Sequence, residues 1–239
     1  MGRIANAVVT GAVLVTVGTA AAVYAADDTE PEPDLPEPDM QTAQELETAA
    51  LEGTGLEIPE GWAIVDVRTE HHDERAVHVI RHQPGDYRLG GPHATVVLDQ
   101  EGTVLGFTRL AEEGAGAALL DAEEAEKRAF DFIHTIAPDY LGGLSVNFVQ
   151  QHDETVTTDD GAEVTVSGMK VKMHHESGLY AWVIIGPDGG VLTYERDIAW
   201  DSGEGRRGTQ MWLHDSWIAA YEGTGPQPAP PYADASREP

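Results

Sequence analysis

Cysteine is absent from this chain of 239 residues. Its absence excludes disulfides, thiolate metal sites, a cysteine nucleophile and a lipid anchor attached to cysteine. An exported form of the protein must therefore be held together by its hydrophobic core, without covalent cross-links.

Basic residues are scarce. The chain holds 14 lysines and arginines against 42 aspartates and glutamates, which gives a formal net charge of −28 at pH 7. Such a protein repels nucleic acid and anionic membrane surfaces. The composition therefore predicts no nucleic-acid partner. Basic proteins or cations stay open as binding partners. Alternatively, the charge simply provides a solvated surface suited to salt or export.

Several catalytic signatures are missing as well. There is no H-E-x-x-H motif, no D-x-D-x-D-G calcium loop, no G-x-S-x-G serine turn and no phosphate-binding glycine loop. His214, Asp215 and Ser216 are adjacent in the chain, whereas members of a catalytic triad converge from separate elements. We therefore predict a non-enzymatic protein with no catalytic residues and no cofactor.

Ten histidines keep a metal site open as an alternative. His71-His72 and His174-His175 are adjacent histidine pairs, and the predicted turns 72–74 and 152–154 both read His-Asp-Glu, which brings imidazole and carboxylate ligands close together in sequence. Adjacent histidines on a strand point to opposite faces, so each pair supplies at most one ligand to a given site. We therefore assign no metal ligands, and a metal-binding protein or metal-dependent enzyme stays an alternative function.

A long hydrophobic run lies at the N-terminus. Arg3 precedes the uncharged stretch 4–26, which is typical of a signal peptide cleaved after Ala25. The stretch also has the length of an uncleaved membrane anchor, about 20 helical residues. Both interpretations of residues 1–25 predict an exported protein, extracellular or in the cell envelope, with 4–26 as a membrane tether in the second. The acidic, proline-rich segment 26–40 is a predicted extended linker.

The body of the chain contains an internal repeat. Residues 94–109 (ATVVLDQEGTVLGFTR) and 181–196 (AWVIIGPDGGVLTYER) align without a gap at an offset of 87 residues. Helix starts are predicted at Thr42 and Asp121, each followed three positions later by glutamate. The predicted fold class is therefore α+β, with two repeated units, 41–112 and 119–200, each a helix plus an antiparallel four-stranded sheet.

Alternating apolar residues and turn sequences define the strands of each unit. Asp159-Asp160-Gly161 is a predicted turn. Val96, Leu98, Val183 and Ile185 are predicted core residues. Besides the repeated hairpins, strands are predicted at 62–68, 76–82, 144–150 and 163–174.

The lines DAEEAEKRAFDFI (121–133) and YAWVIIGPDGGVLTYERD (180–197) resemble the PepSY family, and residues 42–110 and 121–197 together are similar to tandem PepSY-like exported proteins. The resemblance implies a small binding module, used in related proteins as an inhibitory part of peptidase propeptides or as a stand-alone exported domain. It implies no catalytic residues. We therefore predict an exported, non-enzymatic binding or inhibitory module that acts on a peptidase or another envelope protein, with a structural cell-envelope spacer as a further alternative.

The C-terminal segment 201–239 follows these units. Large apolar residues at near-helical spacing predict a helix over 209–221, which either closes the core or is exposed and docks a partner. Arg206-Arg207, just before it, is interpreted as a flexible basic site or a cleavage point. The composition of residues 223–239 predicts a disordered tail.

Overall fold

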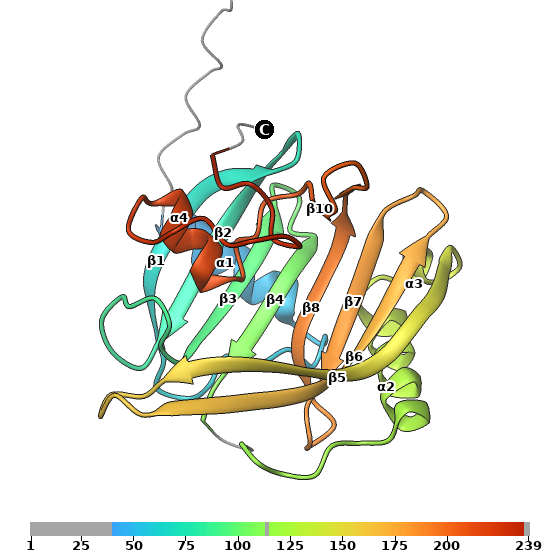
Figure 1. Ribbon diagram of the computed structural model, residues 1–239, viewed down its shortest axis with the longest axis horizontal. Coiled ribbons are helices and arrows are strands. Elements are labelled where there is room, and N and C mark those ends of the chain that lie inside the picture. The colour runs from blue at the N-terminus through green and yellow to red at the C-terminus, as the bar shows by residue number, and fades with distance from the viewer. Residues whose placement is uncertain (1–39, 113–114, 237–239) are drawn as a thin grey trace, which may run out of the picture. The chain divides into compact units, whose positions relative to one another are not determined.

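The computed structural model describes residues 40–112 and 115–236 (Figure 1). The predicted leader or anchor at 1–25, and all of the acidic linker except Met40, lie outside the described residues. The described residues belong to one compact unit, Leu35–Pro239. None of their helices combines the length and the apolar character that crossing a bilayer requires.

The elements have the following bounds. They are α1 (Met40–Leu51), β1 (Ala63–His72), β2 (Arg75–Gln83), β3 (His93–Asp99), β4 (Val104–Leu110), α2 (Ala122–Ile136), α3 (Pro138–Leu141), β5 (Leu144–Thr157), β6 (Glu163–His175), β7 (Tyr180–Ile185), β8 (Val191–Ile198), β9 (Trp200–Asp201), β10 (Arg206–Arg207) and α4 (Asp215–Tyr221).

Strands β1 to β8 form one antiparallel sheet in the order β1-β2-β3-β4-β8-β7-β6-β5. The prediction of two repeated units, each a helix with its own four-stranded sheet of PepSY-like fold, is therefore wrong. Strands β4 and β8 pair at the centre of the sheet, where Phe107 lies opposite Tyr194. In two separate sheets both strands would be edges with unpaired N–H and C=O groups, and their pairing satisfies these groups.

The internal sequence match occupies the middle of this sheet. Residues 94–109 fall in the β3–β4 hairpin and residues 181–196 fall in the β7–β8 hairpin. The two hairpins are neighbours through the β4–β8 pair. The match therefore reflects two similar hairpins side by side in one sheet, both of which need apolar residues at central positions.

Helix α2 begins where the sequence predicts it. The Asp121 side chain accepts a hydrogen bond from the backbone N–H of Glu124, at 2.9 Å, and so caps the first turn. The helix ends at Ile136, before Pro138, which cannot continue the backbone hydrogen-bond pattern. Helix α1 begins at Met40, two residues before the predicted start at Thr42.

One face of the sheet packs against α1 and α2. The apolar side chains between the sheet and these helices form a buried cluster. It contains all four predicted core residues, Val96, Leu98, Val183 and Ile185, so that prediction is confirmed. β-Branched and aliphatic side chains suit this position because they pack well on a pleated surface covered by helices.

The opposite face carries α4 and the C-terminal segment, which lie in front of the sheet in Figure 1. Trp212, Leu213 and Trp217 are buried there against Val97 and Leu105. Of the two interpretations of residues 209–221, the one in which they close the core is confirmed.

The C-terminal segment also differs from its prediction. Only Asp215–Tyr221 is helical, because 209–214 is held in non-helical form by contacts such as the bond from Trp212 Nε1 to the carbonyl oxygen of His71, at 2.7 Å. Residues 223–236 pack against the body, with Ala233 and Ala235 buried. Composition predicts disorder there because it does not register tertiary packing of small side chains.

The β5–β6 hairpin is longer than its neighbours and bends across the front of the sheet (Figure 1). Strand β6 pairs with β7 only through residues 169–174. Gly168 lies where the hairpin leaves β7, and a Cβ there would be 2.5 Å from Ile184 Cγ2. At its far end Thr157 donates its N–H to the carbonyl oxygen of Gly90, at 2.7 Å. The hairpin therefore forms a wall over the sheet face beside α4.

Candidate functional site

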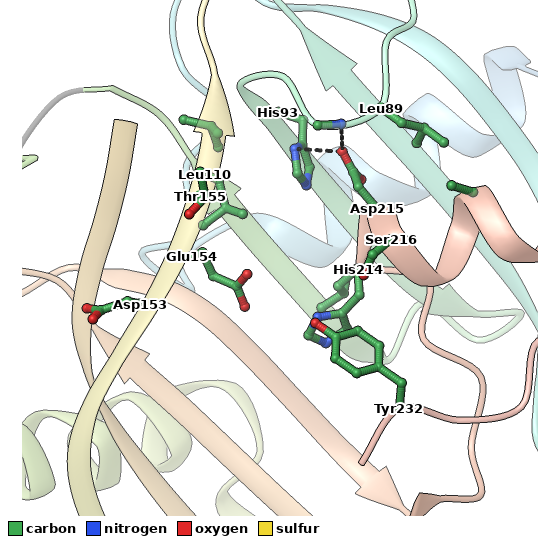
Figure 2. Close-up of a pocket in the computed structure, with 14 residues that line it drawn as sticks. Leu89, His93, Leu110, Asp153, Glu154, Thr155, His214, Asp215, Ser216 and Tyr232 are labelled. Atoms are coloured by element: carbon green, nitrogen blue, oxygen red, sulfur yellow. Dashed lines mark hydrogen bonds and ion pairs between the residues drawn. The ribbon is translucent and has the colours of Figure 1, made fainter. Parts of the chain in front are cut away.

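A pocket of about 500 Å³ lies between the start of α4, the β5–β6 hairpin and the connection from β2 to β3 (Figure 2). We call it the α4 pocket. Its lining combines apolar side chains, such as Leu110, with a few polar groups, among them His93, Glu154, His214 and Asp215. A concave site with few polar groups in an apolar lining is typical of small-ligand pockets.

Asp215 holds the pocket together. Arg81 donates from Nη1 and Nη2 to its two carboxylate oxygens, at 2.7 and 2.8 Å, and the N–H of Gly90 donates to the same group. Burial acts to raise the pKa of Asp215, but the charge of Arg81 and the hydrogen bonds from Arg81 and Gly90 lower it overall, so the carboxylate is ionised. These bonds fix α4 to the β2–β3 connection and leave Asp215 little capacity for a ligand.

His93 presents an unused hydrogen-bonding atom. Its Nδ1 lies 2.8 Å from the carbonyl oxygen of Gly91, to which it donates, whereas its Nε2 is buried and has no hydrogen-bond partner in the described part of the chain. Burial lowers the pKa of His93, so the ring is neutral and Nε2 carries a lone pair. Figure 2 shows this nitrogen on the side of the ring that faces the space bordered by Glu154 and His214. His93 is therefore a built acceptor for a hydrogen-bond donor in the pocket.

Glu154 adds a negative charge to the wall. His152 Nε2 lies 2.9 Å from its Oε1. Burial acts to raise the pKa of Glu154, but the bond from His152 and the nearby His214 and Lys170 lower it overall. The carboxylate is thus ionised at neutral pH and is available on the pocket side (Figure 2).

The position of Glu154 corrects a sequence prediction. Residues His152-Asp153-Glu154 lie inside strand β5, which runs to Thr157, and not in a turn. The turn follows at Asp159-Asp160-Gly161, as predicted, with Gly161 at a positive φ of 84°. Pairing with β6 keeps the polar residues extended, which brings Glu154 to the pocket.

His214 is occupied by a buried ion pair. Its Nε2 lies 3.3 Å from Glu195 Oε2, and Arg207 donates to the other oxygen of Glu195 at 2.6 Å. Arg207 also donates to the carbonyl oxygens of Thr209 and Gln210. Arg207 therefore forms part of a buried network, and Arg206 is held beside it in strand β10, where it pairs with Glu204. The pair is not the flexible basic or cleavage site that the sequence suggested.

The neighbours His214, Asp215 and Ser216 do not act together. His214 contacts Glu195, Asp215 is bound to Arg81, and Ser216 is exposed with no hydrogen bond to another described residue. A serine nucleophile needs a base within hydrogen-bond reach. The geometry provides no such pair.

The other histidines are dispersed. His72 is buried near the carbonyl oxygen of Asp197, at 3.3 Å, and His175 stacks on the ring of Tyr140, with centroids 4.3 Å apart. His174 meets Tyr180 edge-on. Within residues 40–112 and 115–236, no group of three or more histidine and carboxylate side chains is arranged to hold a metal ion.

Comparisons with protein-family models, with curated proteins and with solved structures found no match for this chain. The resemblance to the PepSY family therefore rests on the short sequence motifs alone.

Proposed function

We propose that this protein is a non-enzymatic binding module whose α4 pocket receives a positively charged amino group of a peptide or protein partner. The observation that carries the proposal is the buried Nε2 of His93, an acceptor without a partner among the described residues, on a side chain that lines the pocket. A buried polar atom without a partner costs free energy, and a donating ligand would recover it.

The charge of the pocket favours an amine over a neutral donor. An ammonium group has three N–H donors and one positive charge. Glu154 offers an ionised carboxylate and His93 offers a neutral acceptor, so both match that group. The net charge of −28 favours the approach of cations in general. The apolar lining residues, such as Leu110 and Leu213, would contact the carbon atoms beside the amine.

The cellular setting remains part of the proposal. The leader-like residues 1–26 support export to the cell envelope or beyond. An exported peptidase or another envelope protein is the partner class we propose, bound through a lysine side chain or an N-terminal amine. The dispersed histidines do not favour the metal-dependent alternative.

The test uses the full chain and two peptide probes in calorimetric titrations. Acetyl-Gly-Lys-Gly-amide carries the amine, and the same peptide with norleucine in place of lysine lacks it. We expect only the lysine peptide to bind, and Glu154→Gln to weaken it about tenfold or more, since a hydrogen bond to a charged group is removed. His93→Phe, which keeps a ring but no nitrogen, should also weaken binding, with thermal melting as the check of folding.

Glu163→Gln is the matched control. It makes the same chemical change on the same hairpin, at the exposed start of β6 and outside the pocket. The affinity of Glu163→Gln for the lysine peptide should stay within about twofold of that of the unaltered chain, because surface charges far from a ligand contribute little. Equal binding of the lysine and norleucine peptides, or equal effects of the two glutamate substitutions, would overturn the amine assignment.

A further inference from the structure

Lysine and arginine side chains are almost all paired with carboxylates. Apart from Arg3 and Arg237, which lie outside the described residues, ten of the twelve have a carboxylate oxygen within 4.0 Å. The two exceptions are Lys170 and Lys172. In a chain with 42 acidic residues, two neighbouring cations without a carboxylate partner indicate that this part of the surface is kept positive.

The two lysines share one face of strand β6, since a single residue separates them. Both reach the ring of Trp182, which lies opposite Lys172 on β7. The Lys170 Nζ is 4.2 Å from the centroid of that ring, and the Lys172 Nζ is 6.0 Å from it. Trp182 itself is only 5% exposed, because it packs in an apolar cluster and the lysines lie over its ring.

Two more aromatic rings surround Lys172. Its Nζ lies 4.6 Å from the centroid of Tyr180 and 4.7 Å from that of Trp200. Phe148, on the edge strand β5, is 5.9 Å away and 38% exposed. We call Lys170, Lys172, Phe148, Tyr180, Trp182 and Trp200 the lysine shelf.

Covering Trp182 is a structural role that the lysine stems fulfil with their methylene groups. This role does not explain why two ammonium groups lie beside a third cation, the guanidinium of Arg207. The Arg207 Cζ lies 5.6 Å from the centroid of the Trp182 ring. Arg207 is neutralised by Glu195, whereas neither lysine has a carboxylate oxygen of a described residue within 4.0 Å. Cation–π contacts do not use the N–H donors that point away from the ring.

The shelf favours an anion for a further reason. Burial lowers the pKa of Lys170 to about 8, and Lys172 and Arg207 act in the same direction. Glu195 on β8 and Glu154 on β5 oppose this decrease without cancelling it. The charged form of Lys170 is therefore destabilised in the free protein, and an anion bound beside it would stabilise that form.

We propose that the lysine shelf binds two carboxylates of an acidic peptide segment in extended conformation. Alternate residues of a strand are about 6.6 Å apart, so Lys170 and Lys172 have the same spacing as carboxylates at alternate positions of an extended peptide. The exposed ring of Phe148 lies where the methylene groups of such a peptide would pack. Nucleic acid, with its dense charge, is repelled by the protein as a whole.

The shelf and the pocket share no residue, although Lys170 and Glu154 act on each other's pKa, and the two proposals are tested with probes of opposite charge. Failure of the amine peptide to bind would therefore count against the pocket alone, and failure of the acidic peptide to bind would count against the shelf alone.

The test measures fluorescence anisotropy of a labelled acetyl-Glu-Thr-Glu-Thr-Glu-amide with the full chain at 150 mM salt, pH about 7, where the Debye length is about 8 Å. The glutamine counterpart of the peptide lacks the charges. We expect the glutamate peptide to bind at least about tenfold more tightly, and Lys170→Met or Lys172→Met to remove most of that difference. Methionine keeps an apolar stem over Trp182, and Lys172→Arg, which retains the charge, should restore binding.

Lys127→Met is the matched control, since Lys127 is the one remaining lysine of the chain and lies on α2. It should leave the affinity within about twofold of the unaltered chain. The affinity should also fall as the pH rises from 7 to 9, because Lys170 loses its proton near pH 8. Equal binding of the two peptides, or equal effects of Lys127→Met and Lys170→Met, would overturn the proposal. Tighter binding of a phosphorylated or nucleotide probe than of the glutamate peptide would also overturn it.

Discussion

Glu195 and Arg207 form an ion pair in which both side chains are only 3% exposed. Neither charge has access to bulk water, so each depends on the other and on His214 and the carbonyl oxygens around them. Removing one partner of such a pair leaves the other charge buried and uncompensated. At the scale of single residues this network, which anchors β10 to β8, is the most sensitive point of the pocket's surroundings.

We expect Glu195→Gln to lower the free energy of unfolding by about 3 kcal/mol at pH 7, because it leaves Arg207 without its carboxylate. Burial acts to raise the pKa of Glu195, but Arg207 and His214 hold it well below the usual range. The stabilisation is therefore present above the ordinary pKa of 4.5 and is lost as the pH falls below it. The difference in free energy of unfolding between the unaltered chain and Glu195→Gln, measured by urea unfolding, should therefore become smaller below pH 4.5.

Glu204→Gln is the control for that experiment. Glu204 pairs with Arg206, the neighbour of Arg207, but its side chain is 57% exposed. An exposed pair contributes little, so the change should stay within about 0.5 kcal/mol. Similar decreases in the free energy of unfolding for Glu195→Gln and Glu204→Gln would show that the buried pair stabilises the protein no more than the exposed one.

The candidate site shows what the sequence predicts for single residues and what it does not. Core positions such as Val96 and Val183 follow from alternation of apolar residues. His93 has only a weak signal, a polar residue at the start of the apolar run HATVVLD. Its role depends on Gly91 and on the covering hairpin, which are contacts that no local pattern registers.

At the scale of elements, local chemistry predicts starts and turns better than lengths. The cap at Asp121 and the turn at Gly161 use groups within four residues of one another, and both predictions are confirmed. The predicted strand 144–150 stops short of the true end of β5 at Thr157, because polar residues after it are kept extended by pairing with β6. Cross-strand pairing of this kind is not visible in one segment of sequence.

Gly168 lies where the β5–β6 hairpin leaves β7, and the backbone of β7 passes close to it. We expect Gly168→Ala to lower the free energy of unfolding by about 1 to 3 kcal/mol, since its Cβ would meet Ile184 and the carbonyl oxygen of Ile185. It should also loosen the hairpin tip, which amide exchange at Thr157 would report, because that N–H is bound to Gly90.

Gly142→Ala provides the comparison for Gly168. A Cβ at Gly142 would meet no atom within 4 Å, and its φ of −63° is ordinary for alanine. Stability should change by no more than about 0.5 kcal/mol. If both substitutions had the same small effect, close packing at Gly168 would not explain the path of the hairpin.

At the scale of the whole molecule, the continuous sheet predicts that the two halves unfold together. We expect urea unfolding to show one transition, with far-UV circular dichroism and tryptophan fluorescence coinciding. Trp212 and Trp217 report on the β1–β4 side through Val97 and Leu105, whereas Trp182 and Trp200 report on the β5–β8 side. Two separate transitions for these probes would contradict the β4–β8 pairing.

The continuity of the sheet is the part of the fold that the sequence did not predict. Strands β4 and β8 carry apolar residues that suit either an edge or a central position. Whether the chain forms two sheets or one depends on hydrogen bonding between the backbones of β4 and β8. These strands are far apart in the sequence, so their pairing is a long-range contact. The repeat in the sequence is compatible with both arrangements.

The near-complete pairing of the described cations has a consequence for the kinetics of binding. With ten of them already matched to carboxylates, the surplus negative charge acts on approaching molecules as a long-range field. Amines are drawn toward the protein, and their association rate should fall as salt is added. Acidic peptides are held back, so added salt speeds their arrival, and their residence on the lysine shelf has to come from slow dissociation.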